Sequence, residues 1–202
     1  WRQQHERQIV GELVALAAMP NITGDQQSLL RNVDHISGML ERRDMTPRRV
    51  SLPGGAPVIV RQLRAPAATR TIVFYAHYDG QPLDPREWTT PPFEPVLRNR
   101  AIEAGGNVIP LPEAGVRFDP ESRLYARSIS DDKAPIVAML SALDAVRASG
   151  IHPKAKKPTI ENFKDLKAGY KAIPDTLKDQ DYWKKLFLPD SPKPEPAKPA
   201  ET

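Results

Sequence analysis

The stretch Thr71-Ile72-Val73-Phe74-Tyr75-Ala76 is a nearly continuous run of apolar and β-prone residues. A strand with one face in water alternates apolar and polar residues, whereas a continuous run is typical of a central strand covered on both faces. We therefore predict an α/β fold, a three-layer sheet domain. Residues 71–76 lie in the middle of its sheet, and helices cover both faces.

The segments around this run have the residue spacing of helices and of shorter strands. Apolar residues three and four apart predict a helix near the start of the chain, a second that begins at Asp25 or Ser28, and a third over about residues 135–148. Two β-prone runs, residues 48–52 and 58–63, predict further strands.

Composition excludes several classes of protein. The 202 residues include no cysteine, which excludes disulfide scaffolds, thiolate metal sites and cysteine nucleophiles, so a metal would need His, Asp and Glu ligands. The net charge of +4 is spread along the chain, and we expect no nucleic-acid binding. No apolar run approaches the roughly 18–20 residues of a membrane-spanning helix, so we expect no membrane span.

The chain begins with Trp1. We expect an extracytoplasmic or periplasmic location if this start reflects a removed signal peptide.

The two basic residue types divide the chain. Residues 1–150 hold 17 arginines and one lysine, Lys133, whereas the rest holds 11 lysines and no arginine. We expect three parts: an α/β domain over residues 1–153, a lysine-rich segment of short helices over 154–188, and an extended proline-rich tail over 189–202. Ordinary drift in composition, or an artificial fusion across the junction, would also produce the switch.

Candidate site residues follow the predicted central strand. His77 and Asp79 stand at its carboxyl end, where ligands of open α/β sheets bind. Because the two residues are two positions apart on a strand, their side chains point the same way. Asp131 and Asp132 precede the third helix, whose first turn favours carboxylates. Taken alone, these residues are more often a core histidine, a turn aspartate, a helix cap and a solvated charge.

Three longer motifs carry a family resemblance. They are Phe74-Tyr75-Ala76-His77-Tyr78-Asp79-Gly80-Gln81-Pro82, then Trp88 with Pro91-Pro92-Phe93-Glu94-Pro95, and Leu124-Tyr125-Ala126-Arg127-Ser128-Ile129-Ser130-Asp131-Asp132-Lys133. Together they resemble the amino-terminal part of the co-catalytic zinc metallopeptidases of the carnosinase, dipeptidase and aminoacylase family, over about residues 1–153. The resemblance implies that His77 binds one zinc ion, that Asp131 bridges two, and that Asp79 is the catalytic-site residue that orients His77.

The chain departs from this family in several places, of which the following two bear most on the site. Ala126-Arg127-Ser128 stands where the family usually has Gly-Arg-Gly. After Pro153, the glutamates that would supply the general base and a further zinc ligand are replaced by Lys154-Ala155-Lys156-Lys157-Pro158. His77 and Asp131 remain as candidate zinc ligands where a catalytic zinc normally has three protein ligands and a water. We therefore expect zinc to be weakly bound or absent in this chain.

The lysine-rich segment has more aromatic anchors than a linker normally carries. We expect it to bind a protein partner, because large apolar side chains among charges supply contact area at low entropic cost. The alternative is that the segment packs on its own domain. The predicted partner-binding residues are Tyr170, Trp183, Leu186 and Phe187.

Two functions follow from these expectations. The first is a non-catalytic structural or docking subunit of a larger assembly, with a zinc-dipeptidase-like domain that lacks the second half of the active site. The second is a zinc-dependent hydrolase of dipeptides or N-acyl amino acids whose missing groups come from another chain. The sequence leaves enzymatic activity open and favours an inactive chain, because hydrolysis needs a positioned base and a full ligand set.

Overall fold

A computed structural model describes residues 1–51, 55–63 and 72–150. The chain divides into two compact units, the first of which comprises Trp1–Leu63 and Val73–His152. The lysine-rich segment and the proline-rich tail lie outside the described residues, and so do Tyr170, Trp183, Leu186 and Phe187. In the part of the chain that is described, no helix has the length and apolar character needed to cross a bilayer.

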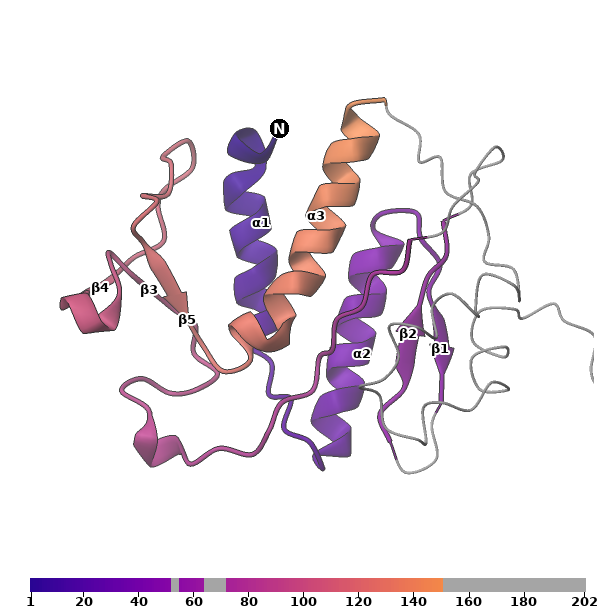
Figure 1. Cartoon of the computed structure of the whole chain (residues 1–202), viewed down its shortest axis with the longest axis horizontal. Coiled ribbons are helices and arrows are strands. Elements are labelled where there is room, and N and C mark those ends of the chain that lie inside the picture. The colour runs from indigo at the N-terminus through magenta and orange to yellow at the C-terminus, as the bar shows by residue number, and fades with distance from the viewer. Residues whose placement is uncertain (52–54, 64–71, 151–202) are drawn as a thin grey trace, which may run out of the picture. The chain divides into compact units, whose positions relative to one another are not determined.

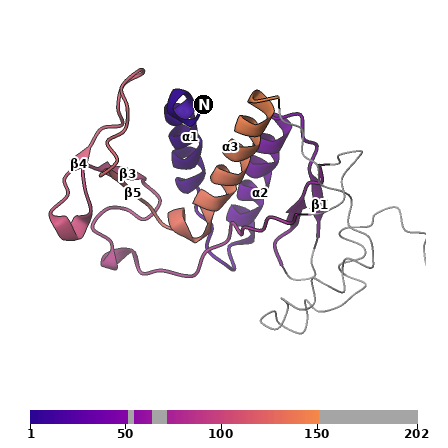
Figure 2. The same cartoon turned by 45° about the horizontal axis from the view of Figure 1, so that its top comes forward.

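Three helices form the centre of the first unit (Figures 1 and 2). They are α1 (Arg2–Ala17), α2 (Gln26–Glu41) and α3 (Ala134–Ala148). The Asp25 side chain caps α2 by accepting a hydrogen bond from the Ser28 amide at 3.0 Å, which satisfies one of the amides that a helix start leaves unpaired. Pro135 lies in the first turn of α3, where its missing amide hydrogen costs nothing. These three helix predictions are confirmed.

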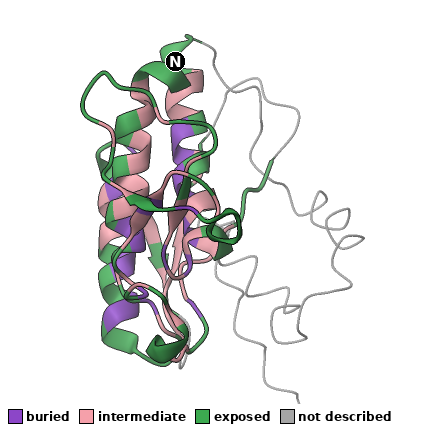
Figure 3. Ribbon diagram, turned by 90° about the vertical axis from the view of Figure 1, so that its left-hand side faces the viewer, coloured by how far each residue is buried: buried purple, intermediate pink, exposed green. Residues whose placement is uncertain are grey.

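The helices bury one apolar core between them. Figure 3 shows buried and half-buried positions alternating with exposed ones along the helices, as expected for amphipathic helices. Arg43 and Lys133 are also buried and contact backbone or acidic groups of neighbouring helices. The buried apolar cluster consists of Leu16, Ile36, Met39, Leu40, Met45, Ile136, Val137 and Leu140.

Two small antiparallel sheets complete the unit. Strands β1 (Arg48–Val50) and β2 (Val58–Val60) pair with each other, and Ile59 packs on the helical core. These are the two shorter strands expected from the sequence. A second sheet has the order β4 (Val108–Ile109), β3 (Val96–Arg98), β5 (Arg123–Tyr125), and the sequence did not predict it. The β4–β5 connection contacts α1, where the Phe118 amide donates to Glu6 at 3.3 Å.

The prediction of a central strand over residues 71–76 is wrong. Thr71 lies outside the described residues, and residues 72–76 are extended chain that belongs to neither sheet. The exposed fractions of Ile72, Val73, Phe74 and Tyr75 are 65%, 48%, 73% and 79%. β-propensity measures how well a residue fits a pleated, half-buried surface, and that surface must come from partner strands. Among the described residues, β1 and β2 pair with each other and leave this run without a partner.

The mixed α/β class itself is confirmed by the arrangement of helices and sheets and by a structural relative described below. The apolar run reaches the core only at its end, where Ala76 and Tyr78 pack against the helices. That contact fixes the segment that follows, which carries His77 and Asp79.

Candidate metal centre

Alternation along extended chain sets the direction of the His77 side chain. Ala76 and Tyr78 pack against the helical core, so His77 and Asp79 point the other way. The Tyr78 hydroxyl donates to the Pro57 carbonyl at 2.6 Å, which ties this segment to the residues before β2. Burial, with a smaller effect from the Asp79 charge, raises the pKa of Tyr78 to about 12, so its hydroxyl remains a donor.

Asp131 comes from the turn that leads into α3. Residues Ile129–Lys133 form this turn, and Asp131 and Asp132 have non-helical backbone angles within it. Lys133 is fully buried at its end and donates from Nζ to the Leu16 and Met19 carbonyls at 2.9 and 2.6 Å. The buried lysine fixes the base of the turn on α1, while the Asp131 side chain is 87% exposed.

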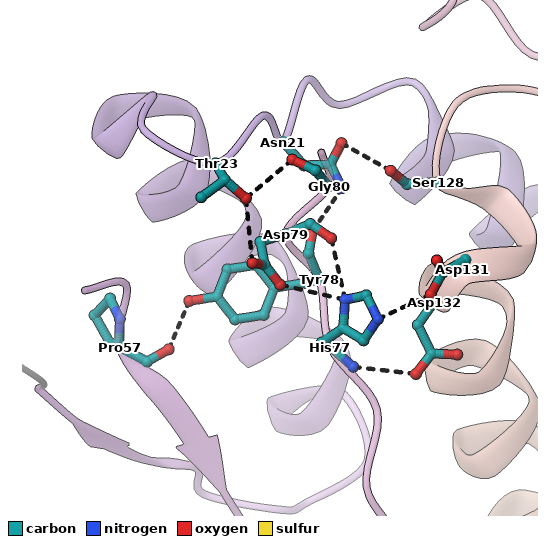
Figure 4. Close-up of polar contacts among 10 residues, drawn as sticks. All are labelled: Asn21, Thr23, Pro57, His77, Tyr78, Asp79, Gly80, Ser128, Asp131 and Asp132. Carbon is teal, nitrogen blue, oxygen red and sulfur yellow. Dashed lines mark hydrogen bonds and ion pairs between the residues drawn. The ribbon is translucent and has the colours of Figure 1, made fainter. Parts of the chain in front are cut away.

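The structure brings His77, Asp79 and Asp131 together (Figure 4). The Nε2 atom of His77 lies 2.9 Å from Asp131 Oδ1. Its Nδ1 atom lies 3.2 Å from Asp79 Oδ1 and 3.1 Å from the Asp79 carbonyl oxygen. Asp132 accepts a hydrogen bond from the His77 amide at 3.2 Å. Carboxylates therefore flank both ring nitrogens, and a third carboxylate holds the backbone.

The groups around His77 determine the pKa of its imidazole. Partial burial lowers the pKa of its imidazole. Hydrogen bonds to the Asp79 carbonyl and the Asp131 carboxylate, together with the charges of both aspartates, outweigh burial and raise the pKa above the ordinary histidine value. Protons therefore compete with any metal ion for His77 at near-neutral pH.

A cavity of about 370 Å³ opens beside this cluster. His77 and Asp131 line it together with Trp88 and Arg127. The Arg127 guanidinium donates to the Gln81 carbonyl at 2.7 Å, which links the segment before Asp131 to the segment after Asp79. The cavity thus joins an aromatic ring, a cation and two candidate ligands.

Sequence reasoning missed several residues that shape the site. Asn21 and Thr23, in the loop between α1 and α2, hydrogen-bond to the segment 78–80. Asp132, interpreted as a cap or a solvated charge, contacts the His77 amide instead. These contacts join residues more than 50 positions apart, and no local pattern marks them.

Comparisons with known proteins find partial relatives of this chain. The chain is 32% identical over 146 residues to succinyl-diaminopimelate desuccinylase of Acidovorax ebreus, covering 69% of this chain and 32% of that protein. It is 25% identical over 122 residues to Cys-Gly metallodipeptidase dug1 of Schizosaccharomyces pombe, covering 57% and 21%. It is 30% identical over 111 residues to human Beta-Ala-His dipeptidase, covering 52% and 17%. No family model matches the chain.

A solved structure supports the same fold. The di-peptidase Dug1p of Saccharomyces cerevisiae aligns with a TM-score of 0.54 and 22% identity over 73% of this chain and 30% of its own. The chain contains a partial zinc-peptidase-like domain. The peptidase-like domain spans about a third or less of the length of the curated relatives it matches. The predicted resemblance is confirmed.

The donor atoms of the peptidase-like domain suit zinc in kind, but the described residues supply few of them. Imidazole nitrogen and carboxylate oxygen bind zinc at about 2.0–2.2 Å, which places two ligand atoms roughly 3.4 Å apart across a tetrahedral angle. The pair His77 Nε2 and Asp131 Oδ1 lies at 2.9 Å, so a small separation of the two side chains would admit an ion. Within residues 1–51, 55–63 and 72–150, no group of three His, Cys, Asp or Glu is placed to hold a metal.

Proposed function

We propose that this chain is a non-catalytic structural or docking subunit of a larger assembly, whose peptidase-like domain carries part of a zinc-dipeptidase site. The observation that carries the proposal is the pairing of His77 with Asp131 in a cluster whose described residues offer no third ligand. Bound zinc would polarise a carbonyl group and activate water. His77 and Asp131 would hold the ion, and Asp79 would orient His77.

An exposed apolar surface supports the docking role. Within the first unit, residues 73–75 present three consecutive large apolar side chains, each at least 48% exposed. Contiguous exposed apolar residues mark interaction sites more often than isolated ones do. We propose that residues 154–202 bind the same protein partner through Tyr170, Trp183, Leu186 and Phe187.

A second candidate function is a zinc-dependent hydrolase of dipeptides or N-acyl amino acids, completed by groups from another chain. The cavity beside His77 and Asp131 favours it, because a purely structural site needs no space for a substrate. In this case the isolated chain is inactive and gains activity with its partner.

An assay of hydrolysis separates the two functions. The full chain is incubated with zinc and a panel of dipeptides and N-acyl amino acids, alone and with copurifying proteins, beside a His77→Ala variant. The docking proposal predicts that no hydrolysis depends on His77 under any condition. Hydrolysis that His77→Ala abolishes would establish the second function and reject the first.

Truncation tests the docking part. A chain that ends at Gly150 should keep the helical fold by circular dichroism and lose association with the copurifying partner. A truncated chain that stays soluble and still enters the same complexes as the full chain would show that residues 154–202 are not part of the interface.

A further inference from the structure

The loop between α1 and α2 holds the segment that carries His77 and Asp79 (Figure 4). The Gly80 amide donates to the Asn21 carbonyl at 2.8 Å, and the Thr23 amide donates to the Gly80 carbonyl at 2.7 Å. The Asn21 side chain adds a bond from Nδ2 to the Tyr78 carbonyl at 2.6 Å. Three hydrogen bonds thus fix residues 78–80 against a loop that is itself anchored by two helices.

The same loop reaches the segment that leads to Asp131. Ser128 is buried, and its hydroxyl donates to Asn21 Oδ1 at 3.3 Å. Asn21 is fully buried, and both the nitrogen and the oxygen of its side-chain amide form hydrogen bonds within the protein. A Cβ atom at Gly80 would collide with Ser128 Oγ and lie 3.2 Å from the Asn21 side chain. The two ligand-bearing segments therefore meet at Gly80 with no space for a methyl group.

Thr23 acts on the ligand cluster more directly. Its hydroxyl is shared between Asp79 Oδ2 at 3.3 Å and the Gly80 carbonyl at 3.0 Å. The other oxygen of Asp79 lies 3.2 Å from His77 Nδ1. A chain of polar contacts therefore runs from Thr23 through Asp79 and His77 to Asp131, and the first member sets the orientation of the second.

We propose that Asn21 and Thr23 are positioning residues of the metal centre: Asn21 fixes the distance between the two ligand-bearing segments, and Thr23 orients Asp79. This inference rests on the proposed metal role of His77 and Asp131. Asp79 then holds the proton on His77 Nδ1, and Nε2, which faces Asp131 Oδ1 at 2.9 Å, would be the nitrogen that ligates an ion bound between the two side chains.

Thr23 provides the cleaner test because it is exposed, whereas Asn21 is fully buried. Thr23→Val removes the hydroxyl and keeps the shape, and Thr23→Ser restores the hydroxyl. Thr89→Val, at another exposed threonine, is the matched control. Two quantities are measured in the full chain: the ¹⁵N shifts of the neutral His77 ring without metal, and zinc affinity by calorimetry.

Thr23→Val should move the neutral ring toward the tautomer protonated at Nε2 and weaken zinc binding roughly 10-fold. Thr23→Ser and Thr89→Val should match the wild type in both readouts. Wild-type ring shifts in Thr23→Val would overturn the positioning role. If the wild-type chain binds no zinc, the proposed metal role fails, and the ring shifts still decide whether Thr23 orients the Asp79–His77 pair.

Discussion

The surroundings of His35 and His77 shift their pKa values in opposite directions. Burial lowers the pKa of His77, but the hydrogen bonds to the Asp79 carbonyl and the Asp131 carboxylate, with the charges of both aspartates, outweigh it and raise that pKa. His35 lies on α2, where burial and then the charge of Arg42 lower its pKa despite the opposing charge of Glu12. Protonation of His77 therefore stabilises the folded state, whereas protonation of His35 destabilises it.

The sign for His35 follows from linkage. Its folded pKa lies below the unfolded value of about 6.5, so the unfolded chain takes up the proton first as pH falls, and stability decreases through that range. His77 contributes stability below about pH 6.5 that is lost as pH rises through its raised folded pKa. We expect His35→Gln to reduce the loss of unfolding free energy between about pH 7.5 and 5.0, measured by urea denaturation. An unchanged pH dependence in His35→Gln would contradict this assignment.

Two glycines should respond oppositely to the same substitution. Gly80→Ala should destabilise the chain by about 1–3 kcal/mol, because the added methyl group meets Ser128 and Asn21. Gly11→Ala lies within α1, where a Cβ meets nothing within 4 Å, and should stabilise the chain by about 0.5–1 kcal/mol. Urea denaturation measures both. Equal effects of the two substitutions would show that residues 78–80 and the Asn21 loop are not closely packed.

Arg43 joins the three helices. Its guanidinium lies 2.7 Å from Glu12 on α1 and 2.7 Å from Asp144 on α3, and it donates to the Met39 carbonyl of α2 at 3.0 Å. The Arg43 side chain is 7% exposed, while Glu12 and Asp144 keep 16% and 22%. Removing one member of a buried ion pair costs about 3–5 kcal/mol when the remaining charge stays dry.

We expect Arg43→Met to lower the unfolding free energy by about 2–3 kcal/mol, less than for a fully buried pair, because both carboxylates can be hydrated. Arg49→Met is the matched control. Arg49 pairs with Asp34 at 2.6 Å, but the two side chains are 45% and 66% exposed, so the loss should stay below about 1 kcal/mol. Equal losses in the two variants would contradict the role of Arg43 in joining the helices.

The elements differ in how far they could be predicted. The helices follow from apolar stripes and from the Asp25 cap, which are local features of the sequence. The apolar run 71–76 was misassigned because the burial of a strand depends on partner strands, which its own residues do not reveal. The sheet of β3, β4 and β5 was missed because strands of two or three residues carry almost no periodicity.

In the molecule as a whole, the candidate metal centre was predicted only in part. His77, Asp79 and Asp131 were singled out because they stand in motifs that resemble a known family, and the structure brings the three side chains together. Asn21 and Thr23 were missed because a single asparagine or threonine in a loop carries no pattern, and their contacts lie 56–57 positions along the chain. The peptidase-like domain spans about a third or less of the length of these relatives.

Zinc calorimetry on the full chain tests the central claim most directly. The pair His77 and Asp131 offers two protein ligands, so we expect at most one ion, bound more weakly than about 1 μM and lost in His77→Ala. Complete structural zinc sites, by comparison, bind with apparent free energies of about 10–16 kcal/mol. Two tightly bound zinc ions per chain would contradict the account and establish a complete peptidase centre.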